Sequence, residues 1–222
     1  GGISGVHHGI KNQFSFASTE ASDIWDSDKI NTVSIVTRHD LHAQQITNAL
    51  NSGKNVFVEK PLALTLDEIK LIDEVYHKVN KSKSTRLMIG FNRRFAPHVI
   101  KLKELLDNNR SPKSIIMTIN SGAIPAEHWV QNNLVGGGRI IGEGCHFIDL
   151  MRHLVGHKIT SFQATMIGNT PGADVREDKA TITLLFEDGS FGTIHYFANG
   201  STTFPKERIE VFCENAVLQL NN

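Results

Sequence analysis

Short apolar runs alternate with amphipathic stretches over the first part of the chain. Three of the runs have the length and composition of buried strands: residues 32–37, 56–58 and 86–91. Between them, residues 41–51 and 65–79 carry apolar side chains at helical spacing. Thr65 and Glu68 have the spacing of a capping box, which opens a helix. Strands that alternate with helices over short links predict a parallel sheet with right-handed crossovers.

The pattern changes after residue 92. Residues 97–106 and 139–154 have helical periodicity. Six segments read as strands: residues 114–121, 160–167, 180–186, 190–196, 207–212 and 216–220. Strands that follow one another through tight turns predict an antiparallel sheet. We therefore expect an α/β domain over residues 1–93 and an α+β domain over residues 94–222, with an open antiparallel sheet.

Composition narrows the class of protein. The chain has 222 residues, of which 40% are apolar and 21% charged, and its formal net charge is zero. Neutral, mixed charge indicates neither a nucleic-acid partner nor an acidic membrane surface. Two distant cysteines, Cys145 and Cys213, are too few for a disulfide framework and favour the reducing cytoplasm. We expect no membrane span and no signal peptide. The histidines are scattered, so we expect no metal site.

A charged pair and a proline follow the second predicted strand: Glu59, Lys60 and Pro61. In parallel α/β sheets, ligands bind at the carboxyl ends of the strands. Lys60 is therefore a candidate for a working site. The alternative is a strand that ends in a loop with two solvated charges.

Three separated motifs occur in a characteristic order. They are Thr37-Arg38-His39-Asp40-Leu41-His42, then Glu59-Lys60-Pro61, then Trp129 followed by Gly136-Gly137-Gly138 and His146-Phe147-Ile148-Asp149. From about residue 17 to its end, the chain resembles the Gfo/Idh/MocA family of nicotinamide-dependent sugar and polyol oxidoreductases. The resemblance is closest to members fused to a zinc-type alcohol dehydrogenase-like half. It implies a Rossmann domain, then an open antiparallel sheet with helices on one face, and NAD or NADP as cofactor.

The sequence departs from the family pattern at two places. The family's first strand, its glycine-rich phosphate loop and the acidic residue after its second strand have no counterpart, so we expect an N-terminally truncated Rossmann domain. The choice between NAD and NADP stays open for the same reason. Gly142 stands where many members carry an aspartate beside the lysine. Glu143 is one residue on, about 100° around a helix, and need not replace it.

The resemblance implies catalytic roles for Lys60 and His146. A free lysine has a pKa of about 10.4, and burial beside a cationic nicotinamide would lower it toward the working range of an acid or base. His146, Asp149 and His153 are spaced to share one helix face. Asp149 is expected to accept a hydrogen bond from His146 and fix its tautomer. The alternative for His146 is a buried core histidine.

The resemblance also implies residues that contact ligands. The cofactor residues are Thr37, His39, His42, Glu59, Lys60, Pro61 and Asn92, with a cis bond before Pro61. The alternative for the first three is a helix N-terminus that Asp40 caps. The substrate residues are Arg93, Trp129, Arg139, Glu143 and Asp149. Linker charge for Arg93 and core packing for Trp129 are the alternatives.

These patterns predict an NAD(P)-dependent oxidoreductase that acts on a sugar, a nucleotide-sugar or a polyol. One rival is a cofactor or sugar sensor without catalysis on the same fold, which Gly142 favours. Another is an assembly domain, because the antiparallel sheet has a face that can pair with a second copy. We expect a homo-oligomer through that sheet, whether or not the protein is an enzyme.

Overall fold

The computed structural model describes residues 2–168 and 175–222. The chain divides into two compact units. The N-terminal unit holds the residues up to Thr37, Leu41–Glu59 and Thr65–Ile89. The C-terminal unit holds Gly90–Asn222 and two short loops, Arg38–Asp40 and Lys60–Leu64. The assignment of dinucleotide binding to residues 1–93, and of substrate binding and oligomerisation to residues 94–222, stays a prediction.

A small parallel sheet forms the centre of the N-terminal unit. Its strands are β1 (Thr32–Ile35), β2 (Asn55–Val58) and β3 (Leu87–Ile89), in that order, and both pairs are parallel. The helices are α1 (Gly2–Lys11), α2 (Ser22–Trp25), α3 (His42–Asn51) and α4 (Leu66–Asn80). α3 packs against α4 and against β1 and β2. The predicted parallel sheet is confirmed; β1 and β3 are shorter than expected, and β2 begins one residue earlier.

Local signals explain where two of these helices begin. Thr65 caps α4 as predicted, since its side chain accepts from the Glu68 backbone N–H at 3.2 Å and Glu68 accepts from the Thr65 N–H at 3.0 Å. The predicted cap by Asp40 is wrong. α3 begins after Leu41 without a side-chain cap, because residues His39–Leu41 form a 3₁₀ turn. The Asp40 backbone N–H donates instead to the Val135 carbonyl at 3.2 Å.

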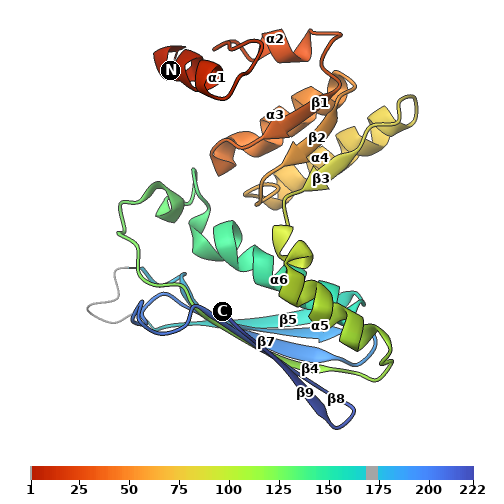
Figure 1. Ribbon diagram of the computed structural model, residues 1–222, viewed down its shortest axis with the longest axis vertical. Coiled ribbons are helices and arrows are strands. Elements are labelled where there is room, and N and C mark those ends of the chain that lie inside the picture. The colour runs from red at the N-terminus through yellow and green to blue at the C-terminus, as the bar shows by residue number, and fades with distance from the viewer. Residues whose placement is uncertain (1, 169–174) are drawn as a thin grey trace. The chain divides into compact units, whose positions relative to one another are not determined.

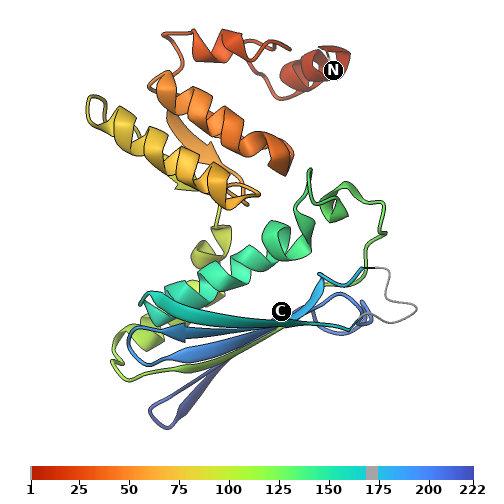
Figure 2. The same ribbon diagram turned by 180° about the vertical axis from the view of Figure 1, so that it is seen from behind.

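A six-stranded sheet forms the base of the C-terminal unit. The strands are β4 (Ser114–Asn120), β5 (Ile159–Met166), β6 (Lys179–Phe186), β7 (Phe191–Phe197), β8 (Glu207–Cys213) and β9 (Ala216–Asn221). Their order in the sheet is β5-β6-β7-β4-β8-β9. The helices α5 (Pro97–Asp107) and α6 (Cys145–Val155) lie on one face of this sheet (Figure 1, Figure 2). The expected open sheet with helices on one face is confirmed.

One pair of strands differs from the expectation. β4 and β7 run parallel, with Ser114 beside Phe191 and Asn120 beside Phe197, so the sheet is mixed rather than wholly antiparallel. Tight turns force antiparallel directions only on strands that they join. α6 and two strands separate β4 from β7 along the chain, so no turn links their directions.

The core of the C-terminal unit lies between the sheet and its two helices. Alternate residues of β4 point inward: Ile115, Met117 and Ile119 are all buried. They join Phe147 and Leu154 of α6 in one apolar cluster. Burial of these side chains holds α6 on the sheet and so fixes the position of the residues just before it.

The predicted helix over residues 139–154 is two elements. Ile140–Gly144 forms a π-helix, and α6 follows from Cys145 to Val155. Gly156 ends α6 in the left-handed conformation, at φ 85°, as its position predicted. A π-turn adds a residue to a helical turn and is frequent at functional sites. In the described part of the chain, no helix is long and apolar enough to cross a membrane.

The buried face of α6 is expected to set the stability of the C-terminal unit. Leu154 has 0% exposure, so Leu154→Ala should lower the free energy of unfolding by about 2–5 kcal/mol. Leu134 has 84% exposure, so Leu134→Ala should change it by no more than about 0.5 kcal/mol. Urea unfolding followed by circular dichroism measures both. Equal effects of the two substitutions would contradict this packing.

Candidate functional site

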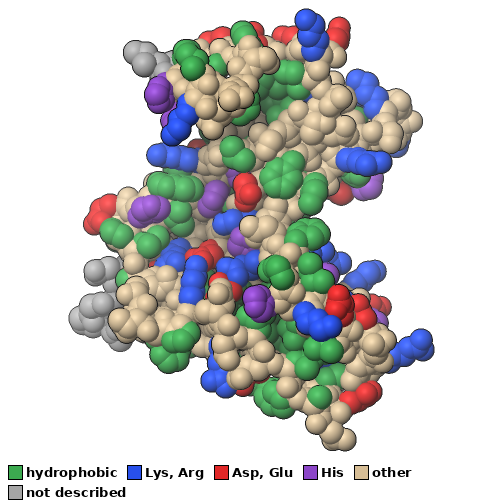
Figure 3. All heavy atoms as spheres, viewed as in Figure 1, with side chains coloured by type: hydrophobic (Ala, Val, Ile, Leu, Met, Phe, Trp, Pro, Cys, Tyr) green, Lys and Arg blue, Asp and Glu red, His purple; other side chains and the backbone are tan. Residues whose placement is uncertain are grey.

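A pocket of about 370 Å³ lies within the C-terminal unit. Its lining residues are His39, Lys60, Arg93, Ile124, Trp129, Val130, Arg139, Gly142, Glu143 and His146. On the face of this unit that Figure 3 shows, basic, acidic and histidine side chains lie close together. The structure therefore brings seven of the predicted site residues into one cavity, from five separate segments of the chain.

Lys60 reaches the pocket from the loop that follows β2. The Lys60–Pro61 peptide bond is cis, as the resemblance implied. The Lys60 ammonium donates to the Gly142 carbonyl oxygen at 2.6 Å. Within the described residues, no carboxylate forms an ion pair with Lys60. A backbone dipole thus positions the ammonium and leaves its other two protons for a ligand.

His146 lies one turn along from Gly142 and is nearly buried, at 8% exposure. Burial, followed by the charges of Lys60 and Arg93, lowers the pKa of its imidazole from 6.5 to about 4. The ring is therefore neutral at physiological pH. Its Nδ1 atom is buried without a hydrogen-bond partner. Such an atom in a pocket wall is a natural partner for a polar ligand or a water molecule.

The expected bond between Asp149 and His146 is wrong. Asp149 instead forms a two-pronged ion pair with Arg94, whose Nε donates to one carboxylate oxygen at 2.7 Å. A planar guanidinium matches both oxygens of a carboxylate, which an imidazole cannot do. Asp149 does not line the pocket. Its predicted contact with substrate therefore has no support in the geometry.

Glu143 is the acidic residue of the pocket. It accepts hydrogen bonds from Arg139 at 2.8 Å and from the Tyr196 hydroxyl at 2.5 Å, and it pairs with Lys206 at 3.2 Å. Burial alone would raise the pKa of Glu143, but these hydrogen bonds and the Lys206 charge lower it to about 2. Burial and the bond to Glu143 raise the pKa of Tyr196. Glu143 is therefore an ionised carboxylate held in place by three donors.

Sequence analysis missed Tyr196 and Lys206. The alternation along β7 places Tyr196 on the buried face, where a hydroxyl group requires a partner. That signal indicates a buried polar contact but does not name Glu143, which is far away in the sequence. Lys206 has no local signal, because it precedes β8 in an irregular stretch.

The cationic side of the pocket is formed by Arg93 and Arg139. Arg93 pairs with the nearly buried Glu207 and stacks over the Phe147 ring at 4.4 Å. Arg139 donates to the Ser121 carbonyl at 3.3 Å as well as to Glu143. Both guanidinium groups are therefore held by partners, so they line the pocket as rigid donors.

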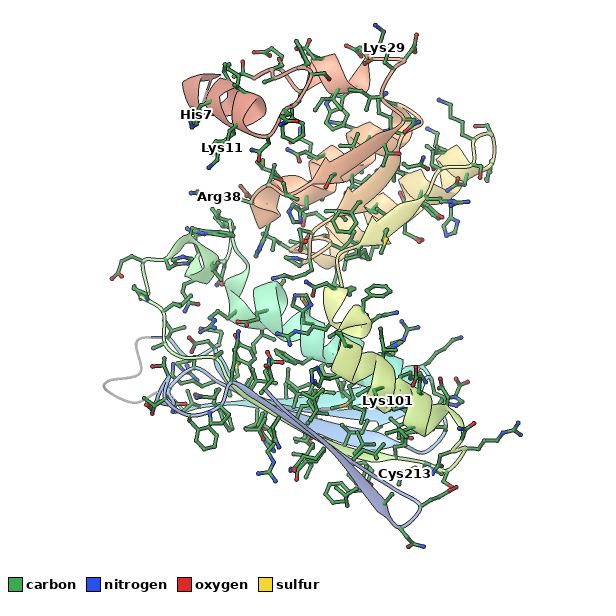
Figure 4. All side chains as sticks on the ribbon, in the orientation of Figure 1. His7, Lys11, Lys29, Arg38, Lys101 and Cys213 are labelled. Carbon is green, nitrogen blue, oxygen red and sulfur yellow. The ribbon has the colours of Figure 1, made fainter. Side chains whose placement is uncertain are left out.

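Trp129 forms an apolar wall of the pocket. Its ring meets His39 edge to face, with the ring centroids 4.9 Å apart. The guanidinium of Arg38, which Figure 4 labels, lies over the same indole at 5.5 Å. Trp129 therefore lines the pocket. Of the two interpretations of this residue, a pocket wall and core packing, the structure agrees with the first.

The other predicted cofactor residues do not line the pocket. Thr37 follows β1 and donates from its hydroxyl to Gln45 at 3.1 Å, and His42 is fully buried with its Nε2 at 3.1 Å from the Thr37 carbonyl. Glu59 follows β2, where its backbone N–H donates to the Ile35 carbonyl at 2.9 Å. Asn92 is exposed after β3. Their contact with a cofactor stays a prediction.

The carboxyl ends of β1 and β2 lie where a parallel α/β sheet binds a nucleotide. Val36 there is 69% exposed, beside the exposed hydroxyl of Thr37 and the half-buried carboxylate of Glu59. An exposed apolar side chain next to polar groups at parallel strand ends suits a planar ring joined to a ribose. Among the described residues, no group of three potential ligands is placed to hold a metal ion.

Named relatives include several dehydrogenases. The chain is 29% identical over 205 residues to the uncharacterized oxidoreductase YrbE of Bacillus subtilis, covering 90% of this chain and 58% of that protein. It is 32% identical over 185 residues to scyllo-inositol 2-dehydrogenase (NAD(+)) of the same organism, covering 80% of this chain and 51% of that protein. The chain thus spans between half and three fifths of the length of these curated relatives.

Solved structures share the fold. A probable dehydrogenase from Thermotoga maritima superposes with a TM-score of 0.85 at 23% identity, over 100% of this chain and 66% of that one. A levoglucosan dehydrogenase in complex with NADH and levoglucosan superposes with a TM-score of 0.84 at 22% identity, over 100% and 62%.

Family models match both units. Residues 8–91 match the model described as oxidoreductase family, NAD-binding Rossmann fold. Residues 99–219, more than half of the chain, match the GFO/IDH/MocA C-terminal domain. Together with the Lys60 pocket and the mixed sheet beneath it, these matches establish that the chain belongs to the Gfo/Idh/MocA family of oxidoreductases.

Proposed function

We propose that the protein is an NAD(P)-dependent dehydrogenase that oxidises a hydroxyl group, or reduces a carbonyl group, of a cyclic polyol or sugar. The observation that carries the proposal is the Lys60 ammonium, held by the Gly142 carbonyl in a pocket that also contains a neutral imidazole and an ionised carboxylate. The matches to an NAD-binding Rossmann model and to inositol dehydrogenases support it.

Lys60 has the central role in this proposal. The cofactor, when bound, accepts or supplies the hydride. Lys60 donates a hydrogen bond to the substrate oxygen and stabilises the negative charge that develops there during the reaction. In oxidation the neutral amine form of Lys60 takes the hydroxyl proton and becomes the ammonium; in reduction the ammonium returns that proton to the substrate oxygen. His146 remains neutral and forms a hydrogen bond to the same oxygen or its neighbour.

The lining of the pocket favours a polyhydroxylated ring. Three cations and two imidazoles offer hydrogen bonds, while Trp129 offers a flat apolar surface for the carbon face of a ring. Relatives named scyllo-inositol, myo-inositol and inositol 2-dehydrogenases act on molecules of this kind, by their names. Cyclic polyols and sugars are therefore preferred here to nucleotide-sugars.

Other details of the expectation remain predictions. Thr37, His39, His42, Glu59, Pro61 and Asn92 are proposed to support the cofactor. The fusion to a zinc-type alcohol dehydrogenase-like half, the preference for NAD or NADP and the cytoplasmic location also stay predictions. The sensor alternative is less well supported, because Lys60 is positioned without a carboxylate partner among the described residues.

Replacing Lys60 tests the proposed role. Lys60→Met keeps an unbranched side chain, one atom shorter, and removes the ammonium group, so kcat/KM for a polyol that the protein oxidises should fall about 10²–10⁴-fold. Lys70→Met, at an exposed lysine of α4, should leave kcat/KM unchanged. Absorbance of the reduced nicotinamide reports turnover. A Lys60→Met protein with normal turnover would contradict the proposal and favour the sensor.

The neutral state of His146 has a consequence for stability. The pKa of about 4 in the folded state lies below the ordinary 6.5, so between these pH values the unfolded chain binds a proton that the folded chain does not. This contribution is fully present above about pH 6.5 and is lost as the pH falls toward 4. The loss of stability amounts to about 2–3 kcal/mol at the low end of this range.

Urea unfolding at pH 7 and pH 4.5 measures this effect. His146→Gln should remove most of that pH-dependent loss, because glutamine does not titrate. His8→Gln, at an exposed histidine of α1, should retain the slope of the wild type. A His146→Gln protein with the same pH dependence as the wild type would show that the folded imidazole is not held neutral.

We also propose that the outer face of the C-terminal sheet pairs with a second copy of the chain. Four half-exposed apolar residues lie in one row across five strands, with Ser114 of β4 between the two phenylalanines: Leu185, Phe191, Phe212 and Val217. Light scattering after gel filtration should show a dimer or larger assembly. Phe212→Asp should dissociate it, whereas Phe162→Asp on the edge strand β5 should not. A wild-type monomer would contradict this assembly.

A further inference from the structure

A second cavity of the C-terminal unit collects basic side chains. It has a volume of about 490 Å³ and lies at the C-terminal end of α6, beside Gly156. The Lys60 pocket lies near the other end of that helix, since it includes His146. Six basic residues from three separate parts of the chain line the second cavity: Arg94, Lys103, Arg152, His153, His157 and Lys158. The reaction proposed at Lys60 uses none of them.

Some of this positive charge has no acidic partner. Three of the six residues have a carboxylate nearby, in the pairs Arg94–Asp149, Lys103–Asp107 and His157–Asp188. Within the described residues, Arg152 and Lys158 form no ion pair, and neither does Glu187, the one carboxylate of the lining. The part of the chain that the structure describes therefore leaves two unpaired cations against one unpaired carboxylate in this cavity.

The end of a helix attracts cations even without a ligand. The carbonyl groups of its last turn carry partial negative charge, which Arg152 and His153 offset in α6. This effect falls off within one turn. It does not account for Arg94, which follows β3, or for Lys103 of α5, because both reach the same cavity from other segments.

The imidazole of His153 responds to the charges around it. Burial, followed by the positive charges of Arg94 and Lys103, lowers its pKa below the ordinary 6.5. The carboxylates Asp149 and Asp107 act in the opposite direction but do not cancel this effect. An anion bound in the cavity would raise the pKa of His153 again, so this ring reports whether the cavity is occupied.

We propose that this cavity binds a small molecule that carries a phosphate group. The planar guanidinium of Arg152 matches two oxygens of a phosphate, and Lys158 supplies a compact cation from the turn after α6. The volume is that of a site for a metabolite rather than for a single ion. The ligand chemistry is a phosphate of at least two negative charges, either free or esterified. The site is separate from the Lys60 pocket, so one proposal can fail without the other.

Calorimetry at low ionic strength tests binding to the 222-residue chain. The probes are pyrophosphate, inorganic phosphate and ribose 5-phosphate, with acetate as a singly charged control that should not bind. Tighter binding of ribose 5-phosphate than of inorganic phosphate would support the site and identify a phosphate ester as its ligand. The reverse order would support the site and identify the free anion. Failure of all three phosphates to bind would overturn the proposal.

Two arginine substitutions give a matched pair. Arg152→Gln should weaken binding of pyrophosphate about 10-fold, because it removes a charged donor from the cavity. Arg110→Gln, at an exposed arginine outside the cavity, should leave binding unchanged. Equal weakening by both substitutions would show attraction to the whole surface and overturn the proposal.

Two glutamate substitutions test the sign of the effect. Glu187→Gln should tighten binding about 2–5-fold, because it removes the carboxylate of the lining. Glu127→Gln, at an exposed carboxylate of the same unit, should leave binding unchanged. Weaker binding after Glu187→Gln would contradict an anion in this cavity.

Proton NMR of the His153 ring supplies a readout that a purely structural role would not move. Saturating pyrophosphate should raise the pKa of His153 in the wild type and should have less effect in Arg152→Gln. If Arg152 serves only to stabilise the end of α6, its replacement lowers the stability of the protein and leaves pyrophosphate binding unchanged. That result, or a His153 pKa that pyrophosphate does not move, would overturn the proposal.

Discussion

The hydrogen bond from Lys60 to the Gly142 carbonyl organises the candidate site. It joins the loop after β2 to the π-helix that precedes α6. A carbonyl accepts without carrying a full charge, so it aims the ammonium without neutralising it. A carboxylate in the same place would hold the lysine in an ion pair and compete with a substrate oxygen. The chemistry proposed for the pocket depends on this choice of partner.

The other charges of the pocket are matched before any ligand arrives. Glu143 is surrounded by three donors, and Arg93 is paired with Glu207. Buried charges without partners are costly, and removing one member of a pair exposes the other to that cost. These pairs keep the walls of the pocket fixed, while Lys60 and His146 remain the groups that can respond to a substrate. Rigid walls around a few responsive groups reduce the reorganisation needed during a reaction.

Much of the fold could be predicted from the sequence, because the residues that begin and end a helix lie within a few positions of its ends. The cap of Thr65 on α4 and the glycine that ends α6 involve residues a few positions apart. The position of Lys60 at a strand end follows from the short apolar run before it. The parallel pairing of β4 with β7 could not be predicted, since the crossover that decides it leaves no mark in either strand.

In the candidate site too, features carried by local motifs could be predicted, whereas contacts between distant segments could not. Lys60, His146 and Trp129 were predicted from motifs, and the structure brings them together. The partner of Asp149 was predicted wrongly, because helix spacing placed His146 nearby while Arg94, from another segment, fits a carboxylate better. Tyr196 meets Glu143 across a long stretch of chain, and only the packed structure reveals that pair.

The central claim is that the Lys60 pocket binds the reacting oxygen of a polyol. A crystal structure of the protein with NADH and scyllo-inositol tests it most directly. The account predicts a hydroxyl oxygen within hydrogen-bonding distance of the Lys60 Nζ atom, with the ring against Trp129. A polyol bound elsewhere, with Lys60 in contact only with Gly142, would contradict the account.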